Sequence, residues 1–430
     1  MDTQQAQALI RFGLGRRGSE PLPADPTAWL RDQIINPDPS QFPAALSTAA
    51  CLIAWRDDSL DPPPPGTPAR VRRILSGEQI QQMNNALVTP APFRERLVWF
   101  WTNHFTISLN RLECLPVAGA FIREAIRPHV AGRFSDMVLA VMRHPAMLMY
   151  LDNWTSIGPK SATGFATGRG LNENLARECM ELHTLSPASG YTQDDVTSFA
   201  RVITGWGIDF ARAEPGFAFD ARSHEPGAKT VFGRSLPEGE QGGIDALAFF
   251  ADHPACHTFL ATKLVRHFVA DEPPPGAVAA IAGVLRDTHG DLGAASLALV
   301  DLPGAWTKLN KLRSPMDYIA ACGRAVEALP VTTTLAAELM AGLGQPLWTP
   351  PLPDGWPDRA EDWAGPEALL RRAELANKIA GRHPDADPAE IADACLGPYL
   401  RAETLSAIRF AGSCRGAMTV LMASPEFMRR

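Results

Sequence analysis

The 430-residue sequence contains neither a long apolar run nor a cluster of basic residues. No stretch approaches the roughly 20 apolar residues that cross a bilayer, and the N-terminus lacks the apolar segment of a signal peptide. Acidic and basic residues are interspersed, and the net charge is −7, so the basic face that nucleic-acid binding requires is also missing. We therefore expect a cytoplasmic protein that binds neither membranes nor nucleic acids.

The seven cysteines are scattered, and none belongs to a C-x-x-C pair. This spacing is typical of reduced thiols and argues against both a disulfide framework and a cysteine zinc site. The H-E-x-x-H motif, the nucleophile elbow and the phosphate loop are missing too. Motifs alone therefore assign no reaction to this chain.

What the chain does contain is helical periodicity interrupted by proline. Hydrophobic residues make up 46% and charged residues 20%, as in globular domains. Several segments repeat an apolar helix, a short break and a proline that opens the next helix, with His144 and His253 placed as caps. We predict a mostly α, large multi-helix fold built from helix-turn-helix units, as one domain over residues 1–430. Weak sub-boundaries are expected at the proline-rich spacer 61–66 and around residues 330–365.

One stretch has the alternation of a β-hairpin. Phe217 and Phe219 alternate with small residues, and Thr230 and Phe232 follow after a polar segment. With Pro226-Gly227 at its turn, this pattern predicts one small β-hairpin near residues 216–234.

Residues 344–363 are too rich in proline and glycine to form a helix over most of their length. Trp348, Trp356 and Trp363 indicate an extended coil that is anchored to the body by aromatic side chains. Stacking of a sugar or a flat ligand on these rings is the alternative to core anchoring.

Residues 92–108 predict an amphipathic helix with a histidine in its apolar stripe. At helical spacing the stripe consists of Phe93, Leu97, Phe100, His104 and Ile107. Glu95, Thr102 and Thr106 lie on the opposite face. We therefore expect His104 to be buried.

Residues 171–185 predict a second helix, with a carboxylate in its apolar stripe. Glu178 lies between Leu175 and Leu182 on that stripe. A buried carboxylate is costly unless it is paired, protonated or bound to a metal. Glu178 therefore needs a partner, and His104 is a candidate from a helix that is buried in the same way.

Histidine nitrogen together with carboxylate oxygen suits both a divalent metal and a general acid–base pair. Glu181 and His183 lie on the edges of the second stripe and can join this pair. We assign Glu178, His104 and His183 as catalytic residues, and the same three with Glu181 as ligands of a divalent metal. The alternative is structural, with Glu178 paired to an arginine in a buried ion network and His104 a satisfied core histidine.

His224 and Lys229 lie in the predicted hairpin, and a polar hairpin in a helical protein often covers a site. Ordinary loop residues are the alternative. We assign His224 and Lys229 to substrate binding, together with Asn103 and Asn174 from the two helices.

Several segments together resemble one bacterial family. They include RFGLGRR, PFRERLVWFWTNHFTIS, GRGLNENLARECMELHTL, HEPGAKTVFG, KLVRHFVADEPPP and ASPEFMRR. From about Arg11 to the C-terminus the chain resembles the domain of unknown function 1800 family. This resemblance implies a helical fold and no established reaction. It also implies a functional partner from an uncharacterised family, number 1501, that is often encoded beside it. The matching positions include Asn103, His104, Asn172, Glu173, Asn174, Arg177, Glu178, Glu181, His183, His224 and Lys229.

These residues lead to three hypotheses of function. The first is an uncharacterised enzyme with a buried His/Glu site, metal-dependent and of hydrolase type. The alternative is a helical binding or scaffold protein in which the same groups form a structural ion network. A further alternative is a haem-dependent redox protein, because the helix of His104 faintly resembles a peroxidase helix.

Overall fold

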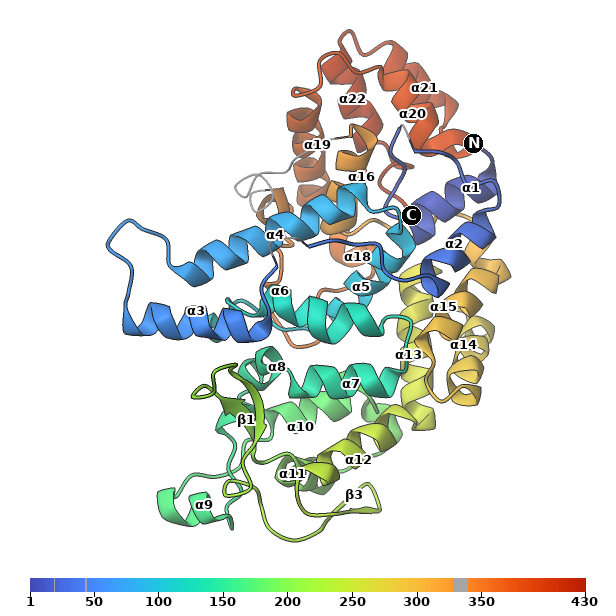
Figure 1. Cartoon of the computed structure of the whole chain (residues 1–430). Helices are drawn as coiled ribbons and strands as arrows, with labels where there is room; N and C mark the ends of the chain where they lie inside the picture. Colours follow the sequence, from blue (N-terminus) through green and yellow to red (C-terminus); the bar gives the residue numbers. More distant parts are fainter. Residues whose placement is uncertain (19, 43–44, 328–338) are drawn as a thin grey trace.

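The computed structural model describes residues 1–18, 20–42, 45–327 and 339–430 (Figure 1). Within them the chain is mostly helical and has two small antiparallel sheets, which confirms the predicted fold class. None of the described helices is long and apolar enough to cross a membrane. Of the predicted sub-boundary around residues 330–365, residues 330–338 lie outside the described part of the chain.

The first half of the chain folds into short helices, and proline opens several of them. Proline suits a first helical position because the N–H that it lacks would have no partner there. The predicted cap at His144 is confirmed, since its Nδ1 accepts a hydrogen bond from the N–H of Ala146 at 3.1 Å. The helices are α1 (Thr3–Gln7), α2 (Pro26–Ile35), α3 (Thr48–Leu60), α4 (Arg70–Val88), α5 (Pro92–His104), α6 (Ala118–Phe121), α7 (Phe134–Arg143), α8 (Pro145–Tyr150), α9 (Ala162–Thr167), α10 (Asn174–Glu178) and α11 (Gln193–Val202).

The second half continues the same pattern. The predicted cap at His253 is confirmed by a 3.2 Å hydrogen bond from the N–H of Ala255 to its Nδ1. The helices are α12 (Glu240–Ala251), α13 (Pro254–Phe268), α14 (Pro275–Asp287), α15 (Leu292–Asp301), α16 (Pro315–Ala325), α18 (Ala360–Trp363), α19 (Pro366–Ala380), α20 (Pro388–Leu396), α21 (Ala402–Arg409) and α22 (Cys414–Ala423).

The β-structure differs from the prediction in its pairing. Strand β2 (Gly216–Phe219) pairs with β1 (Trp206–Asp209), and β3 (Lys229–Val231) pairs with β4 (Arg234–Leu236). Phe232 and Gly233 both have positive φ, 48° and 74°, which is the geometry of a tight two-residue hairpin turn. The chain therefore reverses there, and Pro226-Gly227 connects two hairpins instead of closing one.

The two ends of the molecule are formed by different parts of the chain. In Figure 1, α19 to α22 stack beside α1 at one end, and α7 to α12 with both hairpins form the other. The C-terminal residue lies between these ends, close to α5. One hydrophobic core includes residues from Ala8 to Met428. A single domain over residues 1–430 stays a prediction.

Helix α5 is buried on nearly all sides rather than on one stripe. His104 is only 1% exposed, as expected. Glu95, predicted on the opposite face, is equally buried, because Arg127 donates two hydrogen bonds to its carboxylate at 2.8 and 3.0 Å. The polar face of α5 is thus turned toward other protein groups, and part of it lines the cavity described next.

Candidate functional site

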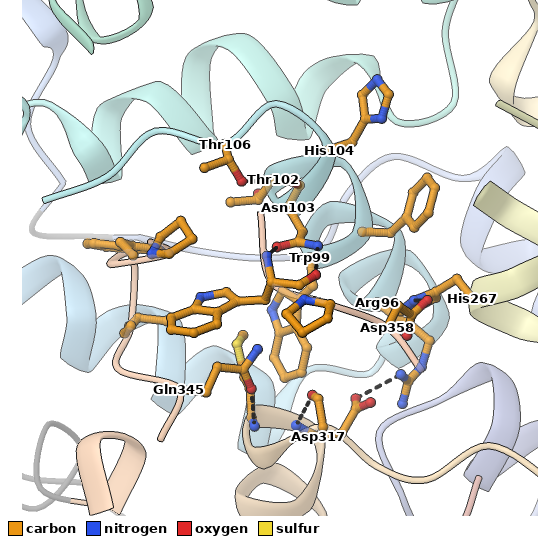
Figure 2. A pocket seen from close by; sticks show the side chains of 18 of the residues that line it. Arg96, Trp99, Thr102, Asn103, His104, Thr106, His267, Asp317, Gln345 and Asp358 are labelled. Atoms are coloured by element: carbon orange, nitrogen blue, oxygen red, sulfur yellow. Dashed lines mark hydrogen bonds and ion pairs between the residues drawn. The ribbon is translucent and has the colours of Figure 1, made fainter. Parts of the chain in front are cut away.

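A cavity of about 340 Å³ lies between α5, α13, α16 and the coil of residues 345–359 (Figure 2). We call this coil the tryptophan strap. The C-terminal residue, Arg430, also lines the cavity. A cavity with aromatic walls and a few polar groups is the usual form of a small-molecule site.

The tryptophan strap is tied to the end of α5 by hydrogen bonds to its backbone. The Asn103 side chain donates to the carbonyl of Trp356 at 2.9 Å and accepts from its N–H at 2.7 Å. Gly355 has φ +86°, and a Cβ added there would collide with the Asn103 carbonyl. Trp348 and Trp363 are each 7% exposed, so the predicted aromatic anchoring holds for these two rings.

The floor of the cavity is a buried ion network. The Asp317 carboxylate lies 2.7 Å from Arg96 Nη1 and 2.8 Å from Arg430 Nε. Arg430 also reaches Asp358 at 3.3 Å, and Lys311 lies 3.5 Å from the same carboxylate. Burial raises the pKa of Asp317, but Arg96 and Arg430 outweigh it, so the pKa lies well below the ordinary value. These carboxylates are therefore ionised at neutral pH.

His267 on α13 lines the cavity and contacts Asp358 of this network. Its Nδ1 lies 2.9 Å from the Asp358 carboxylate, which can only accept, so Nδ1 carries the ring proton. Its Nε2 is buried and has no hydrogen-bond partner among the described residues. Burial lowers the pKa of His267 to about 4, since Arg430 counteracts the opposite effect of Asp358. His267 is thus a neutral imidazole with a free basic nitrogen.

Lys263 lies one helical turn before His267 on the same face of α13, and it also lines the cavity. Its ammonium contacts the ring of Phe259, 5.4 Å from the centroid, and has no hydrogen-bond or ion-pair partner in the described chain. Burial lowers its pKa to about 8, although Asp354 and Asp358 favour the charged form. An unpartnered ammonium in a cavity can bind an anion or stabilise a developing negative charge.

His104 and His183 come together, as the sequence suggested, but they bind each other's backbone. His104 Nε2 lies 3.0 Å from the carbonyl of His183, and His183 Nδ1 lies 2.9 Å from the carbonyl of His104. Burial lowers both pKa values, that of His183 to about 3. In Figure 2 the His104 ring points away from the group formed by Arg96, His267 and Asp358. The remaining nitrogens, His104 Nδ1 and His183 Nε2, are buried without a partner.

Glu178 does not join this pair of histidines. It is half-buried, and its pKa is raised by burial and then by Glu181. In α10 the buried residues are Leu175 and Ala176, and Glu178 lies outside this buried face. A π-helical turn over Cys179–His183 then adds a residue to the turn and shifts the positions after it around the axis. His183 is thereby buried completely, whereas the α-helical wheel had placed it on the rim. The expected enclosure of Glu178 was wrong.

The predicted metal ligands are not assembled as a set. Among residues 1–18, 20–42, 45–327 and 339–430, no three His, Cys, Asp or Glu side chains are arranged to hold a metal ion. Asn174, assigned to substrate binding, is exposed at the start of α10. The amide nitrogen and the amide oxygen of Asn103 both bind the backbone of Trp356, so Asn103 positions the tryptophan strap.

His224 and Lys229 lie away from the cavity, in a polar cluster of their own. His224 Nδ1 lies 2.9 Å from the carbonyl of Thr204, and Nε2 accepts from Gly239 N–H at 3.0 Å. Lys229 Nζ lies 2.9 Å from the same Nε2 and donates to the Glu225 carbonyl. These hydrogen bonds hold the segment that connects the two hairpins in place.

The residues that the sequence did not single out are Lys263, His267, Asp317, Asp358 and Arg430. Lys263 and His267 belong to the segment KLVRHF, whose i, i+4 spacing puts them on one helix face. That spacing was the one available signal. The three others come from distant segments, and only the fold brings them to the same cavity.

The fold and the cavity define a large helical protein with a partly polar cavity that is lined by aromatic residues. The chain belongs to the family described as protein of unknown function (DUF1800), whose model matches residues 7–429. This confirms the family resemblance. No curated protein and no solved structure matches the chain.

Proposed function

We propose that the protein is a hydrolase-type enzyme that uses His267 as its general base. The observation that carries this proposal is the free, buried Nε2 of a histidine whose Nδ1 is held by Asp358 at 2.9 Å. A carboxylate in this position fixes the tautomer and orients the ring, as in hydrolytic triads. Lys263, one turn away in the same cavity, supplies a positive charge.

The reaction that suits this arrangement is attack of water on an ester or amide carbonyl. His267 Nε2 takes a proton as the water oxygen bonds to the carbonyl carbon, and the C=O electron pair becomes an oxyanion. The Lys263 ammonium stabilises that oxyanion in a site of low dielectric constant. The oxyanion then collapses, the bond to the leaving group breaks, and His267 returns the proton to the leaving group.

The test is hydrolysis of p-nitrophenyl acetate and p-nitrophenyl benzoate by wild type, His267→Asn and Lys263→Met. Removal of a general base is expected to lower kcat/KM about 10²–10⁴-fold. His289→Asn is the matched control, because His289 is exposed and its ring also contacts a carboxylate, that of Asp252. Equal rates in wild type and a folded His267→Asn protein would contradict the proposal.

The buried ion network favours a second candidate function, a helical scaffold or binding protein. Arg96, Asp317 and Arg430 form the kind of network that the structural alternative predicted, although it centres on Asp317 and not on Glu178. The ester-hydrolysis test separates the two functions, because a scaffold or binding protein would not hydrolyse esters in this cavity.

Metal-dependent hydrolysis by Glu178, His104 and His183 stays a prediction, as does haem-dependent redox chemistry. Plasma mass spectrometry of wild type beside Glu178→Ala tests the metal, and a Soret band tests the haem. Substrate binding by His224 and Lys229 and a functional partner from family 1501 also stay predictions.

A further inference from the structure

Trp348 is the most unusual residue of the cavity wall. Its φ of 60° lies in the left-handed region, which a bulky L-residue rarely adopts. The backbone is kept there by a 2.8 Å hydrogen bond from the Leu109 N–H to the Trp348 carbonyl. The side chain lines the cavity, and its indole N–H is buried with no acceptor in the described chain. A strained residue that presents an unused donor indicates a ligand atom that accepts from it.

Two more donors line the same cavity without partners. Gln345 uses Oε1 to accept from the Met316 N–H at 2.9 Å, which leaves its amide N–H groups unused. Lys263 has neither a hydrogen bond nor an ion pair to another described residue. The interior thus offers one cationic and two neutral donors, and a complementary ligand must bring acceptor oxygens.

The shape and polarity of the walls restrict the rest of the ligand. Trp99, Phe100 and Trp356 contribute flat apolar surfaces to the lining. The indole N–H of Trp99 is already taken by Glu95 at 3.1 Å, so its ring acts as an apolar face. Aromatic faces favour a flat apolar partner at stacking or edge distance.

The charges around the cavity favour a ligand that carries a single negative charge. Asp354 and Asp362 are exposed members of the lining, so they lie toward solvent and repel polyanions at the mouth. Asp317 and Asp358 in the floor are already paired with arginines. Two more lining cations have partners, since Arg266 donates to the Asp271 carbonyl and Arg359 pairs with Glu272 and Glu361. Among the described lining residues, Lys263 is therefore the cation that has neither a hydrogen bond nor an ion pair and can receive an anionic group.

We propose that the cavity binds a flat aromatic carboxylate, held at its oxygens by Lys263, Gln345 and the Trp348 indole and along its body by the aromatic walls. This inference rests on the proposed hydrolysis, since an aromatic carboxylate is the acyl product of an aromatic ester or amide. It narrows the substrate to esters or amides of aromatic acids.

Binding is measured by isothermal titration calorimetry with three probes of equal shape. They are 2-naphthoate, the neutral 2-naphthamide and the cationic 2-naphthylmethylammonium. We expect 2-naphthoate to bind at least about 10-fold more tightly than the amide, and the cation to bind most weakly. Lys263→Met should abolish the preference for the anion, and Trp348→Phe should weaken 2-naphthoate about 3–10-fold. Lys378→Met, at an exposed lysine of α19, is the matched control, and it should change neither the preference for the anion nor the affinity for 2-naphthoate.

Equal binding of the three probes, tighter binding of the cation, no binding of any probe, or an unchanged preference in folded Lys263→Met would each overturn the ligand class. The same titrations with His267→Asn separate this inference from the proposed function. If His267→Asn still binds 2-naphthoate and still hydrolyses the esters at the wild-type rate, the catalytic proposal fails and the ligand class stands. If hydrolysis depends on His267 but naphthoate does not bind, the ligand class fails alone.

Discussion

Replacing Asp317 by asparagine removes a buried negative charge from between two buried guanidinium groups. Arg96 and Arg430 lie 2.7 and 2.8 Å from its oxygens, and all three side chains are at most 3% exposed. Leaving buried charges without their partner lowers the free energy of unfolding by about 3–5 kcal/mol. For 430 residues with an unfolding entropy of about 2.1 cal/mol/K each, Tm then falls by about 3–6 °C.

The assay is differential scanning calorimetry of wild type, Asp317→Asn and Asp301→Asn at pH 7. Asp301 is the matched control, because it is 55% exposed and pairs with Arg31 at the surface. Surface ion pairs contribute about 0–1 kcal/mol, so Tm of the control should change by about 1 °C or less. Equal shifts in the two variants would refute the assignment of the buried network as a source of stability.

The pH dependence tests the electrostatic cause of the same effect. The pKa of Asp317 in the folded protein lies below its unfolded value, so its contribution is complete above about pH 4 and is lost as the pH falls through the folded pKa. The Tm difference between wild type and Asp317→Asn should therefore be constant near neutrality and shrink in acid. A difference that stays constant down to about pH 2 would contradict this reasoning.

Three further changes have defined outcomes. Gly355→Ala should lower the free energy of unfolding by about 1–3 kcal/mol, because the added Cβ would displace the Asn103 carbonyl. In the control Gly365→Ala the added Cβ meets no atom, so it should have little effect. Urea unfolding measures both. His267 should stay neutral from pH 8 to 5 in NMR titration. Because its folded pKa of about 4 is below the unfolded value, wild type should lose stability as the pH falls from about 6.5, and this loss should be smaller in His267→Asn. His183→Ala should cost about 1–3 kcal/mol by leaving a buried carbonyl unpaired, whereas His183→Asn, which keeps a donor near Nδ1, should cost less in the same assay.

The sequence was sufficient for the fold class because the governing signals are local. Prolines at first helical positions and caps such as His144 act within one turn, so they are readable without the tertiary structure. The hairpin was located but mispaired. Its register depended on the left-handed φ of Phe232, a residue type that does not signal a turn.

The helical wheels found the buried histidine but misjudged the polar faces. A polar face is assigned to solvent when neighbouring elements are unknown, yet Glu95 and Arg96 on α5 are both 1% exposed. In the second helix the π-helical turn before His183 broke the assumption of 3.6 residues per turn. No pattern in that segment marks such a turn, so the position of His183 could not be derived.

The charges of the buried ion network are balanced next to His267. The carboxylates of Asp271, Asp317 and Asp358 face the cations Arg96, Lys311 and Arg430, three against three. Burial is the main cause of the low pKa of His267, and Arg430 lowers it further against the opposite effect of Asp358. In the proposed hydrolysis, a histidine of low pKa would accept a proton briefly and return it to the leaving group. Lys263, outside this balance, keeps the positive charge that an oxyanion or a bound carboxylate requires.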